Sequence, residues 1–464
     1  MENVCAVLLA AGDGKRMKSA RPKVLCEVLF RPMILWVADA VQEAGVRDVC
    51  AVLGCGADEV RAVLPGHFAH VVQAQRKGTA HAVMMAADYI RSGGFEDVVV
   101  LCGDAPFVSA QDLRDAYEQH KTEGNDVTVF SAKVKNPDGY GRIVRDAGVV
   151  SAIVEHTDAD PSTRSIDEIN AGAYWFRAAF LLEALGQLAP ANAQGEYYLT
   201  DTVALAGQTG RRVDAYIAHP DCVLGANDRA GLALLNEIAR TNVIARLHSQ
   251  GVDIPFPQQV VIGRSVSIGC DTTILPGCII KGDTTIGEGC EIGPNSQLNN
   301  ATLGDNCRVV ASLVESSQVE AGATIGPFSN IRPGCVIGKG AKIGDFVEVK
   351  NSNIGAKSSV AHLSYIGDSD IGARCNLGCG IVTVNYDGVN KARVKLGDGS
   401  FVGCNVNLIA PVCLGERAYA AAGTTITQDV PAEALVIGRS RQVVKEGWNA
   451  NGVKYKKGAK ADDS

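Results

Sequence analysis

The chain has 464 residues, of which 46% are hydrophobic and 20% are charged, and its formal net charge is −7. This length allows two or three domains, and the acidic total argues against nonspecific nucleic-acid binding, which needs a clustered excess of Lys and Arg. No stretch approaches the ~18 apolar residues of a membrane span. The first apolar run, 4–11, precedes its positive charges, unlike a signal peptide. We therefore expect a cytoplasmic protein that needs neither nucleic acid nor a membrane.

Residues 1–228 alternate apolar runs with amphipathic stretches. This pattern is typical of βαβ units, so it predicts a Rossmann-like α/β domain with a mostly parallel sheet. The candidate strands are 4–9, 48–53, 97–101 and 126–130.

The first predicted strand leads into a glycine-rich, basic loop, LAAGDGKRMKSARPK, over 9–23. Gly12 and Gly14 would let backbone N–H groups approach a phosphate closely. The pattern is not a P-loop, and Met17 stands where a dinucleotide fingerprint wants a small residue. A polyphosphate site is one interpretation and a basic solvated turn is the other. The cations of the loop are Lys15, Arg16, Lys18, Arg21 and Lys23.

A carboxylate follows the strand predicted at 97–101, in the sequence Cys102-Gly103-Asp104. Open α/β sheets bind ligands at the carboxyl ends of their strands. Mg²⁺ usually takes one or two protein carboxylates together with substrate phosphates. Asp104 is therefore a candidate Mg²⁺ ligand, with a helix N-cap as the alternative.

Residues 229–251 are predicted to form a helical linker, because Leu232, Leu235, Ile238 and Ala239 recur with helical spacing. The prolines at 255 and 257 end that pattern. The remaining residues, 252–464, would form the second domain.

Residues 262–426 carry an apolar residue at every sixth position, usually followed by glycine. A six-residue step suits a short strand and a turn, so three steps form one coil of a parallel β-helix. The step shortens at Leu303, Ile354 and Ile371, and the pattern blurs between 309 and 319. The segment 378–395 is too polar and too long for one step, which predicts a loop ejected from the β-helix as a binding face.

The fifteen cysteines are odd in number and include no CxxC pair. We therefore expect reduced thiols that act as small core hydrophobes rather than metal ligands or disulfides. His362 lies among small polar residues in SSVAHLSYIGD, which favours a functional role over a core histidine without excluding the latter.

Nine motifs stand out along the chain: LAAGDGKRM with RPK, QAQRKGTAHA, LCGDAPF, NPDGYGRIVR, VEHTDA, EINAG, QGEYYLTD, GAND and NYDG. Together they resemble the bacterial bifunctional enzymes that make UDP-N-acetylglucosamine. These enzymes join an N-acetylglucosamine-1-phosphate uridylyltransferase to a glucosamine-1-phosphate N-acetyltransferase. The resemblance extends from residue 4 to residue 448 and implies that the β-helix is left-handed.

For the first site, the resemblance implies that Arg16 and Lys23 are catalytic and contact the triphosphate of UTP. It implies Mg²⁺ bound by Asp104 and Asn227. Further UTP or UDP-N-acetylglucosamine contacts would come from the loop and the strand ends, and the sugar would be held by residues of 141–170. The implied nucleotide and sugar ligands are Leu9, Ala10, Ala11, Gly12, Lys23, Gln73, Gly78, Thr79, Cys102, Gly103, Asp104, Gly141, Glu155, Asn170 and Asn227.

For the second site, the resemblance implies that His362 is the general base that frees the amine of glucosamine-1-phosphate. Arg332, Lys350, Tyr365 and Asn376 would bind the sugar phosphate, and Asn385 would contact both the sugar amine and acetyl-CoA. The other implied acetyl-CoA contacts are Cys379, Tyr386, Cys404, Ala422 and Arg439.

Two residues depart from the family, since Cys379 and Cys404 stand where many members carry Ala and Ser. The weak hydrogen bonding of a thiol puts the coenzyme contact of Cys404 in doubt. The family also implies a homotrimer with acetyl-transfer sites between subunits, and the tail from 449 is expected to be mobile. The alternatives are a single-activity sugar-nucleotide pyrophosphorylase with a structural β-helix, or a noncatalytic assembly protein built from the same folds.

Overall fold

The computed structural model describes residues 1–12, 14–190 and 195–448, so the predicted tail from 449 lies outside the described residues. The chain divides into two compact units, Met1–Ala245 and Arg246–Ser464. Helix α9 (Arg229–Ser249) covers the predicted linker, and the three-part division itself stays a prediction. No helix in the described part of the chain is long and apolar enough to cross a membrane.

The first unit is built on a mostly parallel sheet in the order β11-β7-β10-β6-β1-β4-β5, as the sequence predicts. Only β10 runs antiparallel to its neighbours in this path, and β8 and β9 form a hairpin beside it. The strands are β1 (Val4–Ala10), β4 (Asp48–Leu53), β5 (Ala69–Val72), β6 (Asp97–Cys102), β7 (Val127–Lys133), β8 (Arg142–Asp146), β9 (Val149–Val154), β10 (Glu168–Arg177) and β11 (Val213–Ile217), with a separate pair β2 (Glu27–Val28) and β3 (Arg31–Pro32).

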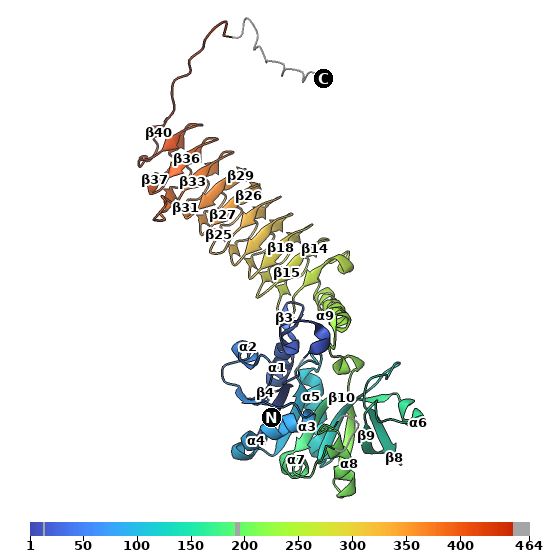
Figure 1. The fold of residues 1–464 in the computed structure, drawn as a ribbon. Coiled ribbons are helices and arrows are strands. Elements are labelled where there is room, and N and C mark those ends of the chain that lie inside the picture. Colours follow the sequence, from blue (N-terminus) through green and yellow to red (C-terminus); the bar gives the residue numbers. More distant parts are fainter. Residues whose placement is uncertain (13, 191–194, 449–464) are drawn as a thin grey trace, which may run out of the picture. The chain divides into compact units, whose positions relative to one another are not determined.

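Helices cover both faces of this sheet (Figure 1). Successive side chains of a strand point to opposite faces of the sheet, so alternate residues of β1 pack against the helices on each face. Ala6 and Leu8 pack in the core with α1 and α5, whereas Cys5 and Val7 pack in the core with α3, α4, α7 and α8. The helices are α1 (Met33–Glu43), α2 (Ala57–Val63), α3 (Thr79–Met85), α4 (Ala87–Gly93), α5 (Ala110–Thr122), α6 (Pro161–Arg164), α7 (Ala178–Leu185) and α8 (Asp201–Gln208).

The second unit is a β-helix of short parallel strands, from β12 (Val261–Ile262) to β40 (Leu435–Val436), that form three sheets (Figure 1). Each strand pairs with the third strand along the chain, so one coil contributes one strand to each sheet. The predicted apolar positions point inward and are buried. Where the sequence pattern blurs, β21 (Leu313–Glu315) turns Val314 inward, so the β-helix continues without a break.

Two expectations need correction. The ejected segment is shorter than 378–395, because β33 (Val382–Val384) and β34 (Val394–Leu396) still pair with neighbouring coils, and only 385–393 leaves the β-helix. The cysteines are all unpaired thiols, but they are not all core residues. In the β-helix, three buried cysteines each lie two residues before an apolar residue that points inward: Cys290, Cys307 and Cys375. Cys270 instead lies two residues after such an apolar residue, and it is exposed. The other exposed cysteines are Cys55, Cys404 and Cys413.

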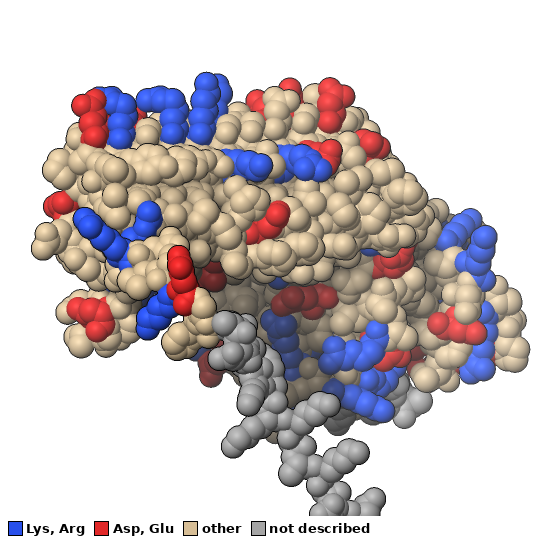
Figure 2. Space-filling view, turned by 90° about the horizontal axis from the view of Figure 1, so that it is seen from above, with Lys and Arg blue, Asp and Glu red and all other residues tan. Residues whose placement is uncertain are grey.

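Charge is mixed on the surface of the described residues. On the face drawn in Figure 2, Lys and Arg side chains are interspersed with Asp and Glu side chains. That face therefore carries small local groupings of charge rather than one large basic or acidic surface.

Candidate active sites

The first unit contains a cavity of about 580 Å³ at the carboxyl ends of β1 and β6, where an α/β sheet binds its ligands. Four of its lining residues were not predicted: the apolar Val24 and Ala82 and the charged Arg76 and Glu196. Eleven predicted residues line it: Leu9, Ala11, Gly12, Arg16, Lys23, Gln73, Gly78, Thr79, Cys102, Asp104 and Asn227.

Lys23 joins the two predicted metal ligands. Its Nζ forms an ion pair with the Asp104 carboxylate and donates a hydrogen bond of 2.8 Å to Asn227 Oδ1. A carboxylate oxygen and an amide oxygen thus converge on one cation, from positions far apart in the sequence. Oxygen donors of this kind fit Mg²⁺, which keeps water or phosphate oxygens as its other ligands.

The glycines of the basic loop differ in their surroundings. Gly14 has a φ of +57°, and a Cβ there would lie 2.8 Å from Lys23 Cβ, so the loop closes on Lys23 only with glycine. A Cβ on Gly12 would meet no protein atom within 4 Å. Gly12 therefore borders open cavity, where a ligand can approach its backbone.

Gln73 is held in a defined orientation beside the cavity. Its Nε2 lies 3.2 Å from the carbonyl oxygen of Gly78 and 2.9 Å from His81 Nδ1. Burial and the nearby Lys77 lower the pKa of His81, so its ring accepts this hydrogen bond as a neutral imidazole. Because the Gln73 NH₂ group donates to both partners, its carbonyl oxygen can accept from a ligand. The Thr79 hydroxyl accepts from the backbone N–H of Leu199 at 3.0 Å.

Three predicted sugar ligands, Gly141, Glu155 and Asn170, form a second group outside the residues that line the cavity. A Cβ on Gly141 would lie 3.4 Å from Glu155 Oε2 and 3.6 Å from Asn170 Cβ. The Asn170 amide donates to the Tyr174 hydroxyl at 2.7 Å. Burial raises the pKa of Glu155, which accepts a 3.3 Å hydrogen bond from Thr200.

The remaining predicted residues of this site have structural contacts. Ala10 is buried in the core beneath α1. Gly103 donates its N–H to the Leu9 carbonyl at 2.9 Å, and a Cβ there would lie 3.0 Å from the same oxygen. Burial raises the pKa of the Cys102 thiol to about 12, so this cavity residue stays a neutral thiol at pH 7.

The sequence contained a signal for both unpredicted charged cavity residues, because Glu196 also lies in one of the family motifs, QGEYYLTD. Arg76 lies in the QAQRKGTAHA motif, directly before the predicted contacts Gly78 and Thr79. Glu196 lies far from this motif in the sequence and reaches the cavity because the next residue, Tyr197, pairs with the backbone of 77–80. The Tyr197 N–H donates to the Lys77 carbonyl at 2.7 Å, and the Tyr197 carbonyl accepts from the Ala80 N–H at 3.0 Å. Local spacing could not reveal that contact.

In the second unit, one corner of the β-helix aligns three of the six predicted acetyl-CoA residues, Cys379, Cys404 and Ala422. We call Asp345, His362, Cys379, Cys404 and Ala422 the corner column, because they occupy equivalent positions in successive coils. The backbone carbonyl of each of the first four members accepts a hydrogen bond from the N–H of the residue that follows the next member. In chain order, these four N···O distances are 2.8, 3.4, 2.7 and 2.8 Å. Arg439 closes the column, since its guanidinium donates to the Ala422 carbonyl.

The neighbouring face carries the predicted phosphate ligands. Arg332 follows β24 (Asn330–Ile331) and Lys350 ends β27 (Glu348–Lys350), and the β24–β27 register places them beside each other. Arg332 also forms a 2.9 Å ion pair with Glu348. Tyr365 begins β30 (Tyr365–Gly367) and folds over Gly367, where a Cβ would lie 2.5 Å from its hydroxyl oxygen.

Asn376 lies on a different sheet from these phosphate ligands. It begins β32 (Asn376–Leu377), which pairs with β29 (Ser359–His362) and β35 (Phe401–Val402). The structure therefore places the predicted sugar-phosphate ligands on the two faces that flank His362, which ends β29 at the corner.

Two contacts fasten the ejected segment 385–393 to the β-helix. At one end, the buried Asn385 side chain donates to the Asp368 carboxylate. At the other, Arg393 binds both oxygens of Asp370, at 3.0 and 2.7 Å. Tyr386 is exposed, and its hydroxyl donates to Gly388 O within the segment at 2.5 Å. The amide of Asn385 is thus already committed to Asp368.

Family models match both units. A nucleotidyl transferase model matches residues 5–220, and a bacterial transferase hexapeptide model of six repeats matches 265–300 and 316–351. A solved structure from Bacillus anthracis, described as a glucose-1-phosphate thymidylyltransferase, has a TM-score of 0.44 and 21% identity, and the match covers 51% of this chain and 95% of that one.

Full-length relatives are much more similar. A bifunctional protein GlmU of Acetivibrio thermocellus is 46% identical over 451 residues, which cover 97% of each chain. A bifunctional protein GlmU of Caldanaerobacter subterraneus is 47% identical over 449 residues, covering 97% of this chain and 98% of the relative. Both matches therefore extend over nearly the whole of this chain and of each relative.

Proposed function

This chain belongs to the GlmU family of bifunctional proteins, and from that membership we propose which of its residues carry out the two reactions. The protein is a uridylyltransferase and an acetyltransferase of UDP-N-acetylglucosamine synthesis. The observation that supports the assignment is that each unit brings charged residues together. In the first unit they surround Lys23 in the cavity, and in the second Arg332 and Lys350 lie side by side near the corner column.

In the first unit, the reaction joins N-acetylglucosamine-1-phosphate to the α-phosphate of UTP and releases pyrophosphate. The sugar phosphate is already an anionic nucleophile, so catalysis needs alignment and charge neutralisation more than a base. Arg16 and Lys23 supply positive charge to the triphosphate. Gln73 accepts a hydrogen bond from the uracil with its amide oxygen, and Glu155 with Asn170 binds the sugar hydroxyls.

Asp104 and Asn227 would hold Mg²⁺, because their oxygens already converge on the cationic Lys23 Nζ. No group of three His, Cys, Asp or Glu side chains among the described residues forms a metal cage. A two-oxygen site suits Mg²⁺ that also binds substrate phosphate. The ion would neutralise phosphate charge as the pyrophosphate departs.

In the second unit, the amine of glucosamine-1-phosphate attacks the thioester carbonyl of acetyl-CoA, and the coenzyme thiol leaves. An amine with a pKa near 8 is largely protonated at neutral pH, so a base must remove its proton. His362 is that base, since an imidazole can accept a proton at neutral pH. Arg332, Lys350 and Tyr365 bind the sugar phosphate, while acetyl-CoA lies along Cys379, Cys404 and Ala422 towards Arg439.

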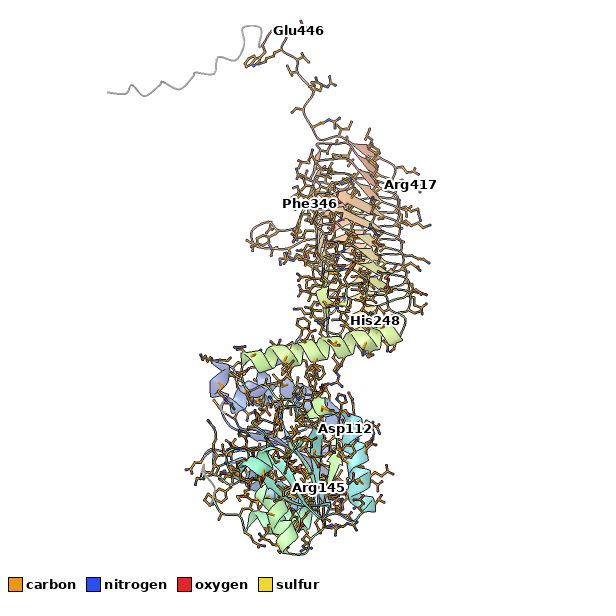
Figure 3. The ribbon with its side chains drawn as sticks, turned by 90° about the vertical axis from the view of Figure 1, so that its right-hand side faces the viewer. Asp112, Arg145, His248, Phe346, Arg417 and Glu446 are labelled. Atoms are coloured by element: carbon orange, nitrogen blue, oxygen red, sulfur yellow. The ribbon has the colours of Figure 1, made fainter. Side chains whose placement is uncertain are left out.

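The protein assembles as a homotrimer through the apolar edge of this corner. Phe328, Phe346 and Leu363 occupy one turn position in successive coils, each with positive φ and about 60% exposed. Phe328 and Phe346 stack at 5.3 Å, and Figure 3 labels Phe346 on the β-helix. A large apolar side chain is unfavourable both at a backbone position with positive φ and when exposed to water. Burial of these three side chains against a second copy of the chain would explain why they occur here. The cytosolic location expected from the sequence stays a prediction.

Light scattering tests the assembly. The parent protein should have the mass of a trimer, and Phe346→Ser should shift it towards a monomer, whereas Leu313→Ser, a 44% exposed leucine on another part of the β-helix, should not. A monomeric parent protein with full acetyl transfer would contradict the trimer.

A one-pot assay tests the two activities. Glucosamine-1-phosphate, acetyl-CoA, UTP and Mg²⁺ are supplied, and free coenzyme A and pyrophosphate are followed separately. We expect both products from the parent protein. His362→Ala should stop coenzyme A release while still forming pyrophosphate from N-acetylglucosamine-1-phosphate. A parent protein that never releases coenzyme A would support the single-activity pyrophosphorylase instead.

A further inference from the structure

The corner column begins with a carboxylate that faces the proposed base. Asp345 ends β26 (Lys342–Asp345), and β26 pairs with β29 so that Asp345 lies directly beside His362. The distance from Asp345 Oδ2 to His362 Nδ1 is 3.7 Å, and the two side chains are 47% and 61% exposed. Neither family membership nor the proposed ligand set assigns a role to this carboxylate.

The backbone fixes this pair. The N–H of Leu363 donates to the Asp345 carbonyl at 2.8 Å, which ties the residue after His362 to the neighbouring coil. A Cβ on Gly344 would lie 2.0 Å from the Ala361 carbonyl oxygen, so only glycine allows the two coils to approach this closely. The two side chains therefore leave adjacent strands at the same level and on the same side.

We propose that Asp345 is the positioning residue of His362: it holds the imidazole with Nδ1 towards the carboxylate and stabilises the positive charge that the ring gains. This inference rests on the proposed role of His362 as general base. Because Asp345 faces Nδ1, the ring keeps its proton there and presents the Nε2 lone pair to the substrate amine. When Nε2 takes the amine proton, the imidazolium lies beside a carboxylate instead of water alone.

This role predicts a specific kinetic signature. Asp345→Ala should lower kcat for acetyl transfer by about 10- to 100-fold, the usual scale for losing a partner that orients a reacting histidine, while the KM values for acetyl-CoA and glucosamine-1-phosphate change little. Asp345→Asn keeps an oxygen for Nδ1–H but removes the charge, so its kcat should lie between those of Asp345→Ala and the parent. Uridylyl transfer by the same proteins should stay unchanged, and an unchanged melting temperature would report that the β-helix still folds.

A double-mutant comparison separates positioning from structural support. In a His362→Ala background, Asp345→Ala should have no further effect on the residual acetyl transfer, because the residue it acts through is gone. The control is Glu291→Ala, which breaks the 2.9 Å ion pair with Arg308 on the same sheet at the same 47% exposure, and should leave acetyl transfer unchanged.

The outcomes are distinguishable. Parent-like kcat in Asp345→Ala, an equal loss in the His362→Ala background, or loss through KM alone would each overturn the role of Asp345 while leaving His362 as base. Full acetyl transfer by His362→Ala would instead overturn the proposed function of the site.

Discussion

Lys23 is the residue on which the first site converges, because its ammonium nitrogen binds both Asp104 and Asn227. Lys23→Ala removes the cation that would meet the triphosphate, so we expect kcat/KM for uridylyl transfer to fall by about 100- to 1,000-fold. Arg21→Ala is the matched control. It removes a cation of the same loop that is 48% exposed and already pairs with Glu27 at 3.0 Å. Equal losses in the two variants would show that general loop charge, not the position of Lys23, matters.

The loop glycines make a second prediction at this scale. Gly14→Ala would place a methyl group 2.8 Å from Lys23 Cβ at a φ of +57°, so it should displace Lys23, lower uridylyl transfer and cost about 1–2 kcal/mol of stability. Gly12→Ala meets no protein atom, so it should leave the melting temperature unchanged and raise the KM for UTP. Thermal unfolding and steady-state kinetics measure both effects. If Gly12→Ala had the same KM for UTP as the parent protein, the triphosphate would not lie against Gly12.

The chemistry of single residues was more predictable from the sequence than their partners were. The motifs named Lys23, Asp104 and Asn227, but the direct contact of Lys23 with both depends on a fold that brings residues about 200 apart in sequence together. Likewise, His362 stood out by its polar surroundings. Asp345 did not, because coil length varies irregularly: Arg308 pairs with Thr324, but Thr324 pairs with Lys342. Only the β26–β29 register shows which residue faces His362.

At the scale of elements, the ejected segment 385–393 depends on Asp368, which accepts hydrogen bonds from Asn385 and Asn351. Burial alone would raise the pKa of Asp368, but these hydrogen bonds and nearby Lys350 lower it. Because the pKa of Asp368 is lower in the folded than in the unfolded protein, ionised Asp368 stabilises the attachment above the unfolded pKa of about 3.9. This stabilisation is lost as the pH falls through the folded pKa. We therefore expect the segment to loosen below about pH 4.

Amide hydrogen exchange of 385–393, corrected for the intrinsic rate at each pH, measures this attachment. Exchange should rise on acidification in the parent protein. Asp368→Asn should show faster exchange already at pH 7 and a weaker dependence on pH, whereas the exposed Asp283→Asn should behave like the parent. Equal exchange of the segment in Asp368→Asn and the parent at pH 7 would mean that Arg393 alone fastens it.

Elements with a strong repeat were predicted well, and those set by tertiary pairing were not. The buried series of the β-helix follows from its six-residue period, and the strands near 4–9, 48–53 and 97–101 follow from their apolar runs. The polarity of 378–395 suggested one long loop. Thr383 shows why that was too long, since its hydroxyl donates to the Gly367 carbonyl at 3.1 Å and its side chain is buried inside the β-helix.

At the scale of the whole molecule, the two sites lie in separate compact units, and each unit has buried apolar residues of its own. No residue proposed for uridylyl transfer belongs to the unit that holds the corner column. The acetylated sugar phosphate must therefore leave one site and reach the other, either through solution or by a direct route. Variants that inactivate one site each can distinguish these routes.

Mixing Lys23→Ala protein with His362→Ala protein makes this test, because each retains the activity that the other lacks. If the intermediate passes through solution, the mixture should form UDP-N-acetylglucosamine from glucosamine-1-phosphate, acetyl-CoA, UTP and Mg²⁺, after a lag in which N-acetylglucosamine-1-phosphate accumulates. The lag should shorten as the Lys23→Ala protein is increased. Each variant assayed alone on its own half-reaction is the control. If both half-reactions proceed but the mixture forms no final product, the intermediate does not reach solution, and the two units of one assembly must pass it between them.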